Sequence, residues 1–222
     1  MLRNALLAGC ALVAVVALVL FPALAPPAWA HEEAPMPAPT GDGFQSDVAA
    51  DLERTGQKLV ALAEAIPADK YGWRPAEGVR SVSEVFVHTA NTNTFLPPGM
   101  GSAPREGLEV PKDIAAIIAW MQEQEASVTA KDQVVAELKK SIDYAAAAVR
   151  AMSGPALEEQ MDLFGFPASR RAYALILLTH NPEHLGQAIA YARSLGVTPP
   201  WSQPPPAAAE EAEEEDAADS SY

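Results

Sequence analysis

The sequence predicts an all-α domain, a four-helix bundle with a fifth short helix. Apolar residues recur at helical spacing through five segments between residues 44 and 195. Capping residues, glycines and prolines punctuate these segments. No stretch of the domain alternates with period two over strand length, so the pattern does not indicate a sheet. Of the 222 residues, about 160 remain for this domain, which suffices to bury a core without disulfides.

The first 30 residues have the features of a signal peptide. One arginine precedes an almost purely apolar run from Ala5 to Ala25, and the segment ends in a small-x-small pattern at Ala28-Trp29-Ala30. We therefore expect export, to the periplasm or the medium, with the mature chain starting at His31. The apolar run is long for a signal peptide, so a membrane tether by an uncleaved segment is the alternative. Residues 31–43 are Pro-rich and predict an extended leader.

Two helices open the predicted domain. The first spans residues 44–66 and ends at Pro67, after which residues 67–80 form a turn-rich link. Ser81-Val-Ser-Glu84 is a capping box that begins the second helix, which runs to about Phe95. Its apolar side carries Val82, Val85, Phe86 and Thr89. Residues 97–111 are rich in proline and glycine and predict a loop long enough to be a lid or an insertion.

Three further helices complete the pattern. Residues 113–127 form the third helix, with one apolar stripe of Ile114, Ile117, Ile118 and Met121. Thr129 caps the fourth helix, which runs to about Met152 and presents an inward face of Val134, Val135, Leu138, Ile142, Ala146 and Val149. A short segment at 156–166 follows. Ser169 then opens the last helix, which ends at Gly196 before two prolines.

Charge and cysteine content exclude several function classes. The net charge is −14, and nucleic-acid binding is not expected because it depends on basic residues that neutralise phosphates. Residues 204–222 carry seven acids and no base, so we expect a disordered acidic tail. The single cysteine, Cys10, lies in the predicted signal segment. The mature protein therefore has no disulfide, no cysteine nucleophile and no thiolate metal site.

Three of the four histidines occupy predicted helices of the domain. His180 and His184 are four residues apart on the last helix, a spacing that places two imidazoles on one face. His88, on the second helix, could complete a three-nitrogen set with an open coordination position, which is the composition of a catalytic metal site. The alternative is that His88 is a core histidine bonded to a backbone carbonyl and that the pair is incidental.

Two stretches resemble the DinB/YfiT-like superfamily. The first is Trp73–Asn91, where a glutamate precedes the His88 of the second helix. The second is His180-Asn-Pro-Glu-His184-Leu-Gly186-Gln187, followed by an arginine before Gly196 and two prolines. The resemblance covers about residues 44–202, within a domain that we place at 44–203. It implies an up-down four-helix bundle in which His88, His180 and His184 bind a divalent ion, zinc or nickel. Some relatives are thiol-dependent transferases or isomerases, and most have no assigned reaction.

Three residues beside the histidines have two interpretations each. Pro182 lies between the paired histidines, and either kinks a continuous helix or starts a new one after Asn181. Glu84, one turn before His88, either acts as a general base or orients that ring, or else is only the capping-box partner of Ser81. Gln187, three residues after His184, either bonds a ligand imidazole or a substrate, or fills a polar gap in the core.

The function that these observations favour is an exported metal-dependent enzyme. The ion would activate water or substrate, and we lean to hydrolysis of an unidentified small molecule because low-molecular-weight thiols are scarce outside the cytoplasm. A thiol-dependent transferase is one alternative. The other is a non-catalytic bundle, metal-stabilised or metal-free, that serves as an envelope binding module through the 97–111 loop and the tail. The sequence predicts no oligomeric state.

Overall fold

The computed structural model describes residues 43–109, 111, 113–163 and 166–203. Within them, the elements are α1 (Phe44–Ala65), α2 (Val82–Gly99), α3 (Ile114–Ser127), α4 (Lys131–Arg150), β1 (Gln160–Leu163), β2 (Phe166–Ser169) and α5 (Arg170–Ser194), with short 3-10 helices at Ala68–Lys70, Pro155–Glu158 and Pro200–Ser202. The predicted all-α fold is confirmed. The predicted signal segment, leader and acidic tail lie outside the described residues, save Gly43, the last residue of the leader.

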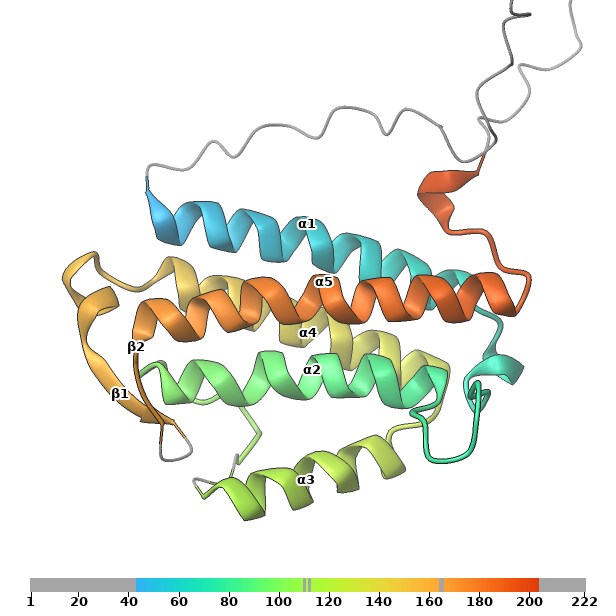
Figure 1. Cartoon of the computed structure of the whole chain (residues 1–222), viewed down its shortest axis with the longest axis horizontal. Coiled ribbons are helices and arrows are strands. Elements are labelled where there is room, and N and C mark those ends of the chain that lie inside the picture. Colours follow the sequence, from blue (N-terminus) through green and yellow to red (C-terminus); the bar gives the residue numbers. More distant parts are fainter. Residues whose placement is uncertain (1–42, 110, 112, 164–165, 204–222) are drawn as a thin grey trace, which may run out of the picture. The chain divides into compact units, whose positions relative to one another are not determined.

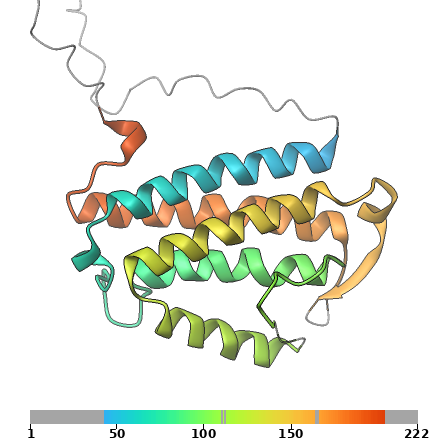
Figure 2. The ribbon, with the colours of Figure 1, turned by 180° about the vertical axis from the view of Figure 1, so that it is seen from behind.

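Helices α1, α2, α4 and α5 form the bundle, in which α4 and α5 each pack against both α1 and α2 (Figure 1). The short helix α3 packs on the outer side of α2. Successive helices alternate in direction, and the view from behind shows the same order (Figure 2). Because α3 returns the chain between them, α2 and α4 run parallel. None of the described helices combines the length and apolarity needed to cross a bilayer.

The core lies where the predicted apolar stripes of α1, α2 and α4 meet α5. One cluster is centred on Leu59, Phe86 and Leu138, and a second on Leu52 and Leu177. All five side chains are at most 2% exposed. Burial of this apolar surface is the main stabilising contribution to the bundle.

The close approach of α1 to α4 depends on a glycine. Gly56 on α1 faces Ile142 on α4, and a Cβ at this position would overlap the Ile142 side chain. Such packing leaves no room for even one additional methyl group without displacement of a neighbour.

Helix starts follow the sequence with one exception. Ser81 and Glu84 form both bonds of the capping box, and the Ser169 hydroxyl accepts from the amide of Ala172 at the start of α5. The predicted cap at Thr129 is wrong, because α4 begins at Lys131 with Ala130 in the capping position.

The apolar stripe predicted for α3 is only partly buried. Ile117 is buried, but Ile114 and Ile118 are 42% and 48% exposed. The reason is the position of α3 outside the bundle, where one neighbouring helix covers only a narrow strip of its surface. A stripe of apolar residues therefore identifies α3 as a helix without fixing how much of it is covered.

Two local predictions need correction. Helix α2 does not end near Phe95 but continues through Pro97 and Pro98 to Gly99. Prolines in a last turn remove few amide bonds, and the amide of Met100 still donates to the carbonyl of Leu96 at 3.1 Å.

The antiparallel hairpin β1–β2 was not predicted, because strands of four residues are too short to show an alternating pattern.

Candidate metal centre

Three imidazoles meet between α2 and α5. Nε2 of His180 lies 3.3 Å from Nε2 of His88 and 3.1 Å from Nε2 of His184. One ligand atom from each ring falls within 4.8 Å of the other two. The structure thus brings together the three histidines that the sequence singled out, with one nitrogen of each directed to a common point.

Helix α5 is continuous through Pro182. The helix runs unbroken from Arg170 to Ser194 with Pro182 inside it, so the four-residue spacing keeps His180 and His184 on one face. Of the two interpretations of Pro182, the structure shows the continuous helix. The proline ring is exposed, and the bond it forgoes is the one to the carbonyl of Leu178.

A buried amide pair fixes α2 against α5 beside the histidines. Asn93 Nδ2 donates to Asn181 Oδ1 at 3.0 Å, and Asn181 Nδ2 donates to Asn93 Oδ1 at 2.9 Å. Both side chains are 1% exposed. Because Asn181 follows His180 directly in the sequence, this reciprocal pair sets the register in which His180 faces His88.

Two of the rings are held through their outer nitrogen atoms. His88 Nδ1 bonds Glu125 Oε1 at 2.8 Å, and His184 Nδ1 bonds Gln187 Oε1 at 2.9 Å. Both partners are acceptors, so each Nδ1 carries the proton and donates. The lone pair of each ring is then on Nε2, the atom directed to the common point, as in histidines that ligate metals.

The supporting hydrogen bonds converge on Arg80. Its Nε donates to Glu125 Oε2 at 2.9 Å. On the His184 side of the site, Gln187 Nε2 donates to the Tyr191 hydroxyl at 3.1 Å, and that hydroxyl donates to the Arg80 carbonyl at 3.1 Å. The side chain and the backbone of one residue therefore anchor the partners of His88 and His184.

Burial favours the neutral form of His180 and His184, which is the form that binds metal. Burial, followed by the neighbouring His184 and His88, lowers the pKa of His180 to about 3. Burial also lowers the pKa of His184. Burial alone would raise the pKa of Glu125, but hydrogen bonds from His88 and Arg80 outweigh it and hold the pKa below its ordinary 4.5.

The donor set fits a divalent first-row ion. Three neutral imidazole nitrogens are typical ligands of zinc and of nickel, and they leave a coordination position for water or substrate. The Thr92 hydroxyl lies 3.3 Å from His180 Nε2 and donates to the carbonyl of His88. Within the described part of the chain, the buried Nδ1 of His180 has no hydrogen-bond partner, so no residue anchors this ring through its outer nitrogen.

The two other predicted site residues are placed differently. Gln187 contacts His184, whereas both carboxylate oxygens of Glu84 are engaged at the start of α2. One accepts from the Ser81 amide at 2.7 Å and the other from Arg74 at 3.0 Å. A catalytic role of Glu84 stays a prediction, and these contacts favour its capping alternative.

Sequence reasoning missed Glu125 and Arg80. Glu125 ends the run Gln122-Glu-Gln-Glu125, which has the composition of a solvated helix face, yet its side chain is 12% exposed. It lies 37 residues from His88 in the sequence. No local signal distinguishes it from the exposed Glu123.

The fold and the site define a helical-bundle protein with a candidate three-histidine metal centre. The family model of the DinB superfamily matches residues 51–188, which is more than half of the chain. The chain therefore belongs to the DinB superfamily.

Solved structures show the same fold at low sequence identity. A DinB-like protein from Bacillus cereus is 15% identical with a TM-score of 0.57, covering 69% of this chain and 94% of that one. The DinB-like protein YjoA from Bacillus subtilis is 19% identical with a TM-score of 0.53, covering 68% and 94%. An uncharacterised protein from Escherichia coli UTI89 is 14% identical with a TM-score of 0.50, covering 69% and 95%. None of the curated proteins matches the sequence.

Proposed function

We propose that this member of the DinB superfamily is an exported metal-dependent enzyme in which His88, His180 and His184 hold one divalent ion, zinc or nickel. The observation that carries the proposal is the convergence of three imidazole nitrogens, one from each ring, within 4.8 Å of one another. The bonds from two of the rings to Glu125 and Gln187 support it, because they leave the Nε2 lone pairs available for a ligand.

In this centre the three histidines would bind the ion, and their hydrogen-bond partners would orient the rings. A divalent ion supplies Lewis-acid chemistry when bound, either to a water molecule or to a carbonyl or thiolate of the substrate. Glu125 and Gln187 hold two rings in the orientation that binding requires. The hydroxyl of Thr92, beside the nitrogen atoms, can accept a hydrogen bond from a bound substrate.

Hydrolysis of a small molecule is the reaction that we propose. The predicted signal segment places the protein where low-molecular-weight thiols are scarce, which argues against thiol transfer. Recovery of the protein from a periplasmic or culture fraction with His31 as its first residue would support export. A full-length chain in the membrane fraction would contradict it.

The metal content of the purified chain, without a histidine tag, tests the centre. Elemental mass spectrometry should find close to one zinc or nickel per chain in the wild type and in His31→Ala, the same substitution outside the domain. The ion should be lost in His184→Ala. A wild-type protein that takes up no ion from excess metal would overturn the proposal.

Activity and stability measurements then distinguish the roles of the ion. A chelator-sensitive turnover of ester, amide or phosphoester substrates would support hydrolysis, and turnover only with an added thiol would replace it with thiol transfer. A catalytic ion is removed at modest cost to the fold. A collapse of the melting temperature on chelation, without any turnover, would instead indicate a structural ion in a binding module.

A further inference from the structure

The large apolar side chains that the described part of the chain exposes gather beside the metal centre. They are Ile114, Ile118, Leu175 and Ile176, each between 41 and 48% exposed. Ile176 lies one turn before His180 on α5, and Ile118 lies two turns before Glu125 on α3. Residues four or seven positions apart share a helix face. Both isoleucines therefore continue the helix faces that form the metal centre, whereas Leu175 lies off the face of His180.

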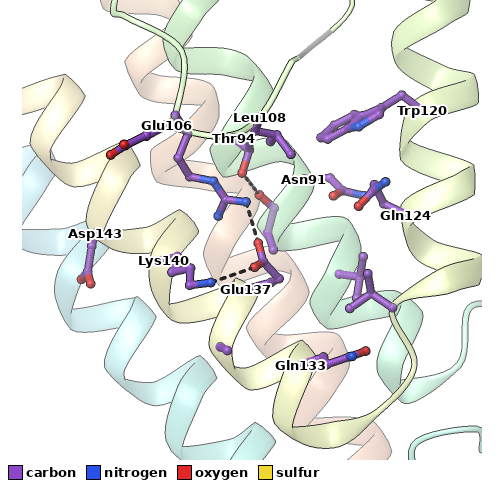
Figure 3. A pocket seen from close by; sticks show the side chains of 16 residues that line it. Asn91, Thr94, Glu106, Leu108, Trp120, Gln124, Gln133, Glu137, Lys140 and Asp143 are labelled. Atoms are coloured by element: carbon purple, nitrogen blue, oxygen red, sulfur yellow. Dashed lines mark hydrogen bonds and ion pairs between the residues drawn. The ribbon is translucent and has the colours of Figure 1, made fainter.

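The two sides of α3 face different surroundings. Trp120 and Gln124 reach from α3 into a cavity on the side of α4 (Figure 3). Glu125 is directed the other way, to His88. Ile118 shares the face of Glu125, so its side chain lies on the metal-centre side of α3 and not in the cavity.

A hydrogen bond fixes the position of Ile118 along α2, which lies between α3 and α5 (Figure 1). Asn91 Nδ2 donates to the carbonyl of Met121 at 3.3 Å. The two helices run antiparallel, so one turn onward on α2 corresponds to one turn back on α3. Phe95 and Ile118 therefore lie at the same level.

Ile176 lies at this level too, on the other side of α2. The Thr92 hydroxyl is 3.3 Å from His180 Nε2, and one turn along the antiparallel pair of helices brings Phe95 level with Ile176. Phe95 is half-buried. We call Phe95, Ile118 and Ile176 the apolar strip, and it lies about 10 Å along α2 from His88, since seven residues separate His88 from Phe95.

The opposite end of the metal centre is polar. Arg80, just before the start of α2, is paired with Glu125, and its side chain is 42% exposed. Gln187 and the Tyr191 hydroxyl lie on the same side and are joined to the Arg80 carbonyl by hydrogen bonds. A hydrocarbon group at this end would displace water from polar groups without replacing its hydrogen bonds, which is costly. The apolar strip offers no such penalty.

Resting on the proposed function, we propose that the substrate of the metal centre is an acyl compound whose aliphatic chain lies on the apolar strip. The strip is continuous with the metal centre along both α3 and α5, which assigns it to the ligand of that centre. Single exposed apolar residues need no explanation, but a group of them beside a candidate site indicates a contact surface. The hydroxyl of Thr92, between His88 and Phe95 along α2, lies where the polar part of such a substrate meets its chain.

Calorimetric titration of the zinc-loaded chain with acetohydroxamate and hexanohydroxamate tests the proposal. Both chelate zinc through the same two oxygen atoms, so only the chain differs between them. Hexanohydroxamate should bind the wild type about tenfold or more tightly, because each buried methylene contributes up to about fourfold. The preference should fall to about threefold or less in the double variant Ile118→Ser, Ile176→Ser. It should persist in Leu175→Ser, which removes an equally exposed apolar side chain from another face of α5.

Nuclear magnetic resonance of the isoleucine methyl groups locates the bound chain directly. Hexanohydroxamate should shift the signals of Ile118 and Ile176 in the zinc-loaded wild type more than acetohydroxamate does. The signal of Ile142, which is buried between α1 and α4, should stay in place.

The outcomes separate this substrate class from the metal centre itself. Equal affinity for the two hydroxamates, or a preference that survives in the double variant, would overturn the proposal while the metal centre stands. A chain that takes up no zinc would overturn the proposed function and the substrate class with it. A dimer that binds both hydroxamates equally and that Ile118→Ser dissociates would assign the apolar strip to a second copy of the chain instead.

Discussion

Replacement of Glu125 by alanine tests whether the residue behind His88 matters for metal binding. The variant loses the bond to His88 Nδ1 at 2.8 Å and the bond to Arg80 Nε at 2.9 Å. The ring of His88 is then free to turn its Nε2 away from the other two histidines. Residues that hydrogen-bond to a metal-ligating histidine contribute about 10- to 100-fold to metal affinity, or about 1.4 to 2.7 kcal/mol.

The assay is a competitive zinc titration against a chromophoric chelator at pH 7. Glu125→Gln should show a smaller loss than Glu125→Ala, because its amide oxygen still accepts from His88. Glu123→Gln, on the exposed side of the same helix, should bind zinc as the wild type does. If Glu125→Ala binds zinc within about threefold of the wild type, the carboxylate does not orient His88 and the reasoning fails.

Three further predictions follow from particular contacts. Gln187→Ala should weaken zinc binding about tenfold, since His184 loses its hydrogen-bond acceptor. Unchanged affinity in the same titration would show that Gln187 does not support the metal site. Asn93→Leu should lower the free energy of unfolding in urea by about 1 to 3 kcal/mol, because Asn181 keeps a buried amide with no side-chain partner, and an unchanged midpoint would contradict this. Burial alone would raise the pKa of Glu137, but the bonds from Arg105 and Lys140 outweigh it and lower the pKa, so the carboxylate stabilises the fold above its ordinary 4.5 and this stability is lost as the pH falls through the lowered value. The melting-temperature advantage of wild type over Glu137→Gln should therefore shrink between pH 7 and pH 3, and a constant difference would refute it.

The sequence predicts the bundle because burial depends on residue type and spacing. Apolar stripes at helical spacing identify α1, α2, α4 and α5, and capping residues locate the starts of α2 and α5. An apolar stripe also identifies α3, but spacing does not reveal how many neighbours cover a helix. The exposure of Ile114 and Ile118 follows from tertiary packing alone.

The candidate site also contains residues that the sequence reveals and residues that only tertiary contacts reveal. The three histidines are recognisable because imidazole is a metal ligand and because two of them share a helix face. Glu125 and Arg80 could not be selected, since their roles arise from contacts between separate helices and loops. The outcome at Pro182 also depends on packing, because the local preference for a helix start at Asn181 is overcome by the buried pair between Asn181 and Asn93.

The placement of Glu125 on α3 ties the metal centre to a weakly anchored helix. Of the residues of α3, Ile117 alone is buried, and segments with little buried apolar surface open locally at low free energy. A transient opening of α3 would withdraw the carboxylate from His88 while the four main helices stay folded. We therefore expect the ion to be released on warming before the bundle melts, with amide hydrogen exchange in α3 faster than in α2 or α5.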